Sequence, residues 1–138
     1  MRTTSGRCRL SCSAILLLAV SLLQCGLIGP SVDRFVIRVA DISAPSMISA
    51  SDTLQIRFAG GIGPDGCWNL DRVDRQATKG TLELTFRGKH EVRVGFDCTQ
   101  MPTALDYVER IPPPLETPFS ITVHQPDGKI LRRQVIIQ

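Results

Sequence analysis

The sequence has few of the residues from which enzyme active sites are usually built. Its 138 residues include only two histidines, one tryptophan and one tyrosine. Neither His90 nor His124 has a partner at the spacing of a metal site, so we expect both on the surface. No serine lies in a nucleophile-elbow motif, and strands do not alternate with helices along the chain. We therefore expect a protein that is not an enzyme and that holds no metal or cofactor.

A long apolar run is also missing. The longest run, AILLLAVSLL at residues 14–23, is well below the ~20 residues of a membrane-spanning helix. It follows three arginines, and a basic stretch before a short apolar run is typical of a secretory signal peptide. We predict an exported protein with three parts, namely a signal peptide at 1–25, a short linker at 26–32 and one β-sandwich domain at 33–138.

The end of the signal segment, LLQCG, resembles the box of bacterial lipoproteins. Leu22 lies three positions before Cys25, and Gly26 follows the cysteine. In lipoproteins this cysteine is acylated, which implies lipidation of Cys25. Gln24 departs from the small residue that normally precedes the cysteine, and cleavage after Ser31 is the alternative. The expected location is the periplasm or the outer membrane for a lipoprotein, and outside the cell for a secreted protein.

The remaining domain has no excess of either charge. Without Arg2, Arg7 and Arg9 the 16 basic residues become 13, which equals the 13 acidic ones. Phosphate binding needs a net or clustered positive field, so we expect no nucleic-acid partner. The one basic doublet, Arg132-Arg133, is expected on a solvated strand.

The domain contains only two cysteines, Cys67 and Cys98. Their spacing fits neither a CxxC redox motif nor a zinc site. Two cysteines in an exported domain most simply form one disulfide. A bridge that closes a loop of about 30 residues stabilises a fold by roughly 3 kcal/mol in the chain-entropy model.

From residue 33 onward, apolar and polar residues alternate, which predicts strands with one buried face. About seven such segments can be counted, which is the number in an immunoglobulin-like sandwich of two antiparallel sheets. The apolar sets are Phe35, Ile37 and Val39; Leu54, Ile56 and Phe58; Leu82, Leu84 and Phe86; Val92, Val94 and Phe96; and Phe119, Ile121 and Val123, with CWNLDRVDRQ and KILRRQVIIQ as the other two segments.

Two hairpins are predicted. In the first, residues 88–90 form a three-residue loop that pairs Phe86 with Val92, unless these two strands lie in different sheets. In the second, QPDGK forms a turn that pairs Phe119 with Val135.

The alternation lapses at residues 99–118. Thr103 and Asp106 could cap one helical turn, and three prolines at 112–114 require an extended chain. We expect a long crossover between the sheets with Tyr107 packed inward, although long ordered loops are also often functional.

The stretch GGIGPDGCW contains a literal G-x-G-x-x-G at Gly61, Gly63 and Gly66. A nucleotide cradle would require a helix directly after the glycines, whereas Pro-Asp-Gly indicates a turn. We expect a turn that delivers Cys67 and Trp68 to the next strand. Trp68 would then be a core residue, or else be exposed for a ligand.

Asp71 and Asp74 are the only carboxylates that suggest a catalytic pair, but Arg72 and Arg75 alternate with them. Ion pairs on a solvated strand are the better interpretation, because acid–base catalysis would also need a pocket.

Residues 54–130 resemble, diffusely, uncharacterised bacterial secreted and lipoprotein domains. The likeness is carried by GIGPDGCW, DCTQMPTALDYVERIPPPL and TPFSITVHQPDGK. It implies the fold and the compartment but no active site. The expected function is a non-enzymatic interaction or structural module of the cell envelope, whose partner is another envelope protein bound at an edge strand or at the 99–118 loop. The alternative is a small-ligand or glycan binder that uses Trp68 and Tyr107.

Overall fold

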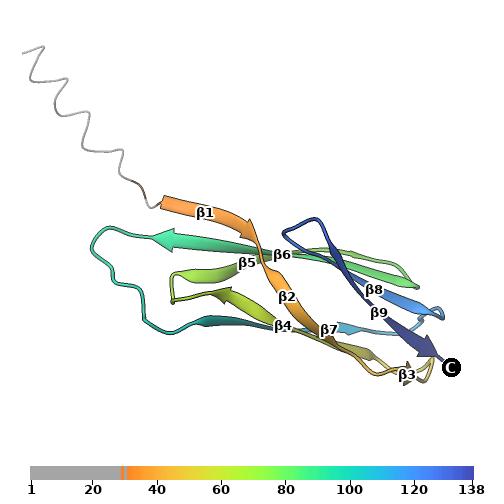
Figure 1. The fold of residues 1–138 in the computed structure, drawn as a ribbon. Coiled ribbons are helices and arrows are strands. Elements are labelled where there is room, and N and C mark those ends of the chain that lie inside the picture. The colour runs from red at the N-terminus through yellow and green to blue at the C-terminus, as the bar shows by residue number, and fades with distance from the viewer. Residues whose placement is uncertain (1–28, 30) are drawn as a thin grey trace, which may run out of the picture. The chain divides into compact units, whose positions relative to one another are not determined.

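The computed structural model describes Gly29 and residues 31–138. This part of the chain contains strands and no helix (Figure 1). Consequently, within the described part, no helix could cross a membrane. The predicted signal peptide and the predicted lipidation site Cys25 lie outside the described residues. The strands are β1 (Ser31–Val36), β2 (Arg38–Ser43), β3 (Met47–Ile48), β4 (Leu54–Gly63), β5 (Trp68–Ala77), β6 (Thr81–Val92), β7 (Thr103–Ile111), β8 (Phe119–His124) and β9 (Ile130–Ile137).

The strands form two sheets. The three-stranded sheet has the order β2-β4-β7, and the six-stranded sheet has the order β1-β6-β8-β9-β3, with β5 also paired to β6. Strand β6 organises the larger sheet because it pairs with three others. β5 lies along one of its edges, while β8 and β1 share the other edge at residues 81–84 and 87–92.

The alternation in the sequence explains how the two sheets share one core. On β4, Leu54, Ile56 and Phe58 are fully buried, and the residues between them are exposed. Phe58 packs against Phe86 of β6 with 5.3 Å between the ring centroids. This contact joins the three-stranded sheet to the six-stranded one.

The predicted all-β fold of two sheets is confirmed, but the purely antiparallel arrangement is wrong. The pairs β6–β8 and β3–β9 are parallel. Strand β7, which lies between β6 and β8 in the chain, belongs to the other sheet, so the chain crosses over and returns in the same direction. Residues 31–138 also form nine strands instead of seven, in part because the first predicted strand breaks at Ile37, where the chain passes from one sheet to the other.

The predicted β8–β9 hairpin is confirmed in its register. Phe119 pairs with Val135, and the N–H of Gln125 donates to the carbonyl of Lys129 over 2.9 Å. Gly128 has a φ of 75°, which a residue with a side chain rarely adopts. Asp127 and Gly128 therefore serve the turn. Arg132 and Arg133 are exposed on β9, as expected.

The predicted hairpin at residues 88–90 is wrong, and so is its alternative of two strands in different sheets. Residues 81–92 form the single strand β6, in which Phe86 pairs with Val73 of β5 and Val92 pairs with Ser31 of β1. Gly88 is not a turn residue. A Cβ atom on Gly88 would lie 2.4 Å from Cζ of Phe35, so this glycine makes room for an aromatic ring.

The predicted helical turn near Thr103 is also wrong. Residues 103–111 form β7, which pairs along its length with β4. The alternation of apolar and polar residues along β7 is interrupted in the sequence. One inward-facing residue, Glu109, is charged, and one outward-facing residue, Val108, is apolar and 41% exposed. Tyr107 faces inward, as expected, and packs against the core.

Candidate functional site

The most unusual surface of the described structure is the loop of residues 93–102, which we call the apolar loop. It leaves the end of β6 and crosses to β7 in the other sheet (Figure 1). Three of its apolar side chains lie largely in solvent, namely Val94 (85% exposed), Phe96 (73%) and Met101 (74%). Isolated exposed apolar residues are normal, but several together on one short loop indicate a contact surface.

The base of this loop is fastened to the turn between β4 and β5. Cys98 forms a disulfide with Cys67, as predicted, with 5.4 Å between the Cα atoms. The N–H of Gly66 donates to the carbonyl of Thr99 over 3.0 Å, and the hydroxyl of Thr103 donates to the carbonyl of Asp65 over 2.8 Å. The apolar loop is therefore fastened from Cys98 onward, by the disulfide and by hydrogen bonds at Thr99 and Thr103.

The same contacts explain GGIGPDGCW. Strand β4 ends at Gly63, the chain turns, and β5 begins at Trp68 without a helix, so the predicted turn is confirmed. A Cβ atom on Gly66 would lie 2.0 Å from the hydroxyl of Thr99, and one on Gly63 would overlap the Trp68 ring. These glycines allow close packing of the turn against its neighbours and do not form a phosphate cradle.

Asp65 lies close enough to both sulfurs for the three groups to resemble a metal site, with their ligand atoms within 4.8 Å of one another. The sulfurs are bonded to each other and are therefore not the thiolates that bind metals. A carboxylate oxygen of Asp65 accepts the N–H of Cys67 over 2.9 Å. Asp65 and the disulfide therefore form the end of the turn between β4 and β5.

Trp68 lies next to the disulfide and is partly buried against the core. Its indole stacks on His90 with 4.4 Å between the ring centroids and 19° between the planes. The ring of Phe35 meets the indole edge-on at 5.1 Å. The expectation that His90 lies in a surface loop is therefore wrong, because His90 belongs to β6 and is half-buried under the indole.

Tyr107 has different neighbours from Trp68. Its ring lies 5.4 Å from that of Phe86 and 6.3 Å from that of Phe58. Its hydroxyl donates to Glu109 over 3.0 Å. Burial raises the pKa of Tyr107, and the hydrogen bond to Glu109 raises it further. The two aromatic residues suggested for ligand binding thus both face the interior and share no aromatic neighbour.

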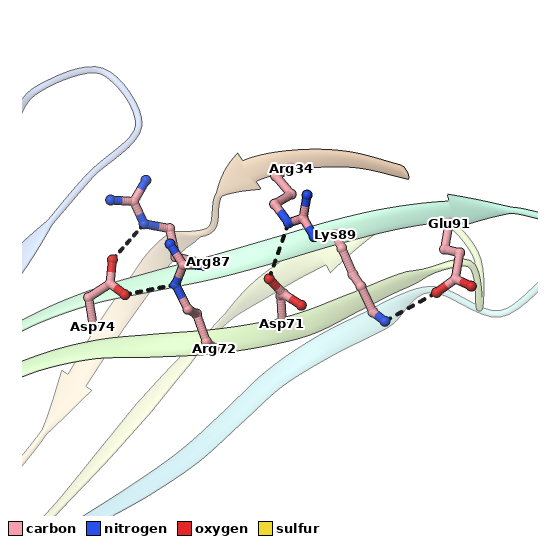
Figure 2. A network of polar contacts seen from close by, with 7 residues as sticks. All are labelled: Arg34, Asp71, Arg72, Asp74, Arg87, Lys89 and Glu91. Carbon is pink, nitrogen blue, oxygen red and sulfur yellow. Dashed lines mark hydrogen bonds and ion pairs between the residues drawn. The ribbon is translucent and has the colours of Figure 1, made fainter. Parts of the chain in front are cut away.

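The outer face of the six-stranded sheet carries a network of ion pairs (Figure 2). Asp74 accepts hydrogen bonds from Nε of Arg87 (2.8 Å) and from Nε of Arg72 (2.9 Å), and these bonds lower the pKa of its carboxyl. Asp71 lies 3.6 Å from Arg34. The predicted ion pairs at Asp71 and Asp74 are confirmed.

His124 lies on the outward side of β8, where its ring nitrogen is 3.8 Å from a carboxylate oxygen of Glu83. Asp74, Glu83 and His124 line a shallow hollow, and Asp71 is not part of it. The side chains of His124 and Glu83 are 46% and 50% exposed, so water reaches both. This geometry has no enclosed space in which a reacting group would be shielded from water.

Comparison of the chain with protein-family models, with curated proteins and with solved structures found no match in any of the three. A function must therefore be inferred from the surfaces of the molecule itself.

Proposed function

We propose that the protein is a non-enzymatic interaction module of the bacterial cell envelope, exported and held at a membrane by a lipid on Cys25. The observation that carries this proposal is the apolar loop. Its exposed Val94, Phe96 and Met101 contrast with the outer face of the six-stranded sheet, where charged side chains are paired with one another. The disulfide fits an oxidising compartment outside the cytoplasm.

One reason to favour the loop as the contact surface is that two of the edge strands, β5 and β7, are protected. β5 and β7 lie at the edges of their sheets, and each directs a charged residue toward the space between the sheets. These residues are Arg75 on β5 and Glu109 on β7, and they pair over 2.7 Å. Inward-pointing charges on edge strands are a common device against the addition of a further strand. A partner strand at β5 or at β7 is therefore disfavoured.

An immunoglobulin-like sandwich is retained as part of the proposal. It is supported by two sheets on one core and by Trp68 beside the disulfide. The two parallel strand pairs depart from that pattern. The alternative function, a ligand or glycan binder, has less support because Trp68 and Tyr107 both pack against the core.

Photo-crosslinking in the living bacterium tests the proposed contact. A photoreactive phenylalanine analogue is placed at position 96, and the matched control carries it at Lys79, which is exposed in the turn between β5 and β6. We expect adducts from position 96 and few from position 79. The partner expected from the sequence is another envelope protein, which would appear as a discrete band of higher mass. Equal labelling at both positions would contradict the proposal.

A further inference from the structure

The apolar loop lies at the end of the molecule where the chain enters the folded domain. In the register of β1 with β6, Ser31 lies opposite Val92, and the apolar loop begins at the next residue. Figure 1 shows the start of β1 and this loop at the same end of the sheets. The loop and the point from which the N-terminal segment leaves the domain are therefore neighbours.

The distance from this end to a lipid anchor is limited by covalent geometry. Ser31 lies six positions after Cys25. At about 3.5 Å per residue, even a fully extended chain places the start of β1 within roughly 20 Å of Cys25. Given the proposed lipid on Cys25, on which this inference rests, the apolar loop is held close to the bilayer surface.

The chemistry of the loop suits the boundary between lipid headgroups and acyl chains. Phe96, Val94 and Met101 are exposed. The two charged residues of the loop have opposite signs, namely Arg93, which also pairs with Glu91 over 2.6 Å, and the exposed Asp97. Insertion would thus be driven by apolar burial, with little contribution from anionic lipid. Because the anchor and the loop belong to one chain, the second contact is intramolecular and has a high effective concentration.

We propose that the membrane carrying the Cys25 lipid, and not the envelope protein expected from the sequence, is what the apolar loop contacts, and that Phe96 and its exposed apolar neighbours insert into its interfacial layer. The disulfide keeps the base of the loop fixed to the β4–β5 turn. The two contacts together orient the domain with the β1 end toward the membrane. The opposite ends of β5 and β6 then point away from it.

The test uses the mature acylated protein, purified from its host membranes and placed in vesicles of phosphatidylethanolamine and phosphatidylglycerol. A share of the lipid is phosphatidylcholine brominated near the headgroup, which quenches tryptophan only at short range. Phe96→Trp reports on the loop. Lys79→Trp is the matched control, because Lys79 lies in the turn before the other end of β6, and the strand from Thr81 to Val92 spans eleven residue steps or roughly 36 Å. The native Trp68 contributes the same background fluorescence in all variants.

We expect brominated lipid to remove about half or more of the emission that Phe96→Trp adds to the background, and little of that from Lys79→Trp. Equal quenching of the two variants in protein that floats with the vesicles would overturn the insertion and leave the interaction module standing. A discrete protein adduct at position 96 without quenching would assign the loop to a protein partner. Protein that lacks the diacylglycerol mass and does not float would overturn the anchor and the insertion together.

Discussion

Arg75 and Glu109 form an ion pair that joins the edges of the two sheets. Nε of Arg75 lies 2.7 Å from one carboxylate oxygen of Glu109, whose side chain is only 9% exposed. The other carboxylate oxygen accepts the hydroxyl of Tyr107. A buried carboxylate is tolerated only when it is paired and hydrogen-bonded, and here both conditions are met.

Replacing Arg75 with alanine should destabilise the fold strongly, because it leaves the Glu109 carboxylate buried without a counter-charge. We expect a loss of about 3 kcal/mol in the free energy of unfolding. The matched control is Arg57→Ala, which breaks the pair with Asp106 on the same strand β7, where both side chains are more than half exposed. Urea titration should show little change for this control. Equal losses for the two variants would contradict the structural role of the inter-sheet pair.

Tyr107 provides a second test because it is the only tyrosine in the chain. Burial, followed by the hydrogen bond to Glu109, raises its pKa above the ordinary value of 10.0. The neutral hydroxyl therefore contributes its full stability below about pH 10, and this contribution is lost as the pH rises through the higher pKa of the folded protein.

Absorbance at 295 nm should give a tyrosine titration midpoint above the ordinary pKa of 10.0 in the folded protein. Glu109→Gln should move the midpoint part of the way back, because it removes the negative charge and weakens the hydrogen bond. Trp68 fluorescence checks that the fold persists at each pH. An ordinary midpoint in the folded protein would show that the phenol is not packed as described.

Gly88→Ala should destabilise β6. The new methyl group would lie 2.4 Å from the Phe35 ring and 3.0 Å from Ile37, and both side chains are packed. Overpacking of this kind costs about 1–3 kcal/mol. Gly61→Ala is the control, because Gly61 is a glycine of strand β4 with nothing within 4 Å of the added Cβ. Thermal unfolding should separate the two variants, and an equal effect would mean that Phe35 does not lie over Gly88.

Removing the disulfide by Cys67→Ala and Cys98→Ala should lower stability by roughly 3–4 kcal/mol, because the bond closes a loop with a sequence separation of 31 residues. Hydrogen exchange should rise most in the apolar loop and in the β4–β5 turn that it contacts. Hydrogen exchange in the β8–β9 hairpin should change least once the loss of global stability is taken into account. A uniform rise would indicate that the bond does not specifically fasten the loop.

Local rules predicted those parts of the fold that depend on neighbouring residues. The Gln125–Lys129 turn has Pro, Asp and Gly at positions where the turn requires them, so its register followed from the sequence. The disulfide followed from there being only two cysteines in the domain. The ion pairs of Asp71 and Asp74 followed from the alternation of acidic and basic residues on β5.

Contacts between distant segments caused the errors. A glycine at position 88 suggests a turn, but the structure requires glycine there because the ring of Phe35 packs against it. Phe35 is more than fifty positions earlier in the chain. Glu109 broke the apolar pattern of β7 because its partner, Arg75, lies on another sheet. The exposure of the apolar loop does not follow from the sequence, because Val94 and Phe96 continue the period-two pattern of β6, which predicts a buried face.

The central claim is that β6 runs unbroken to Val92 and brings the apolar loop to the end where β1 begins. Proton–proton Overhauser effects in an NMR spectrum of the folded protein measure this directly. The structure predicts cross-strand contacts between the backbones of Ser31 and Val92 and between those of Trp68 and His90. Backbone contacts between Phe86 and Val92 in their place would mean that the chain turns back at Gly88, and would remove the basis for a membrane-facing loop.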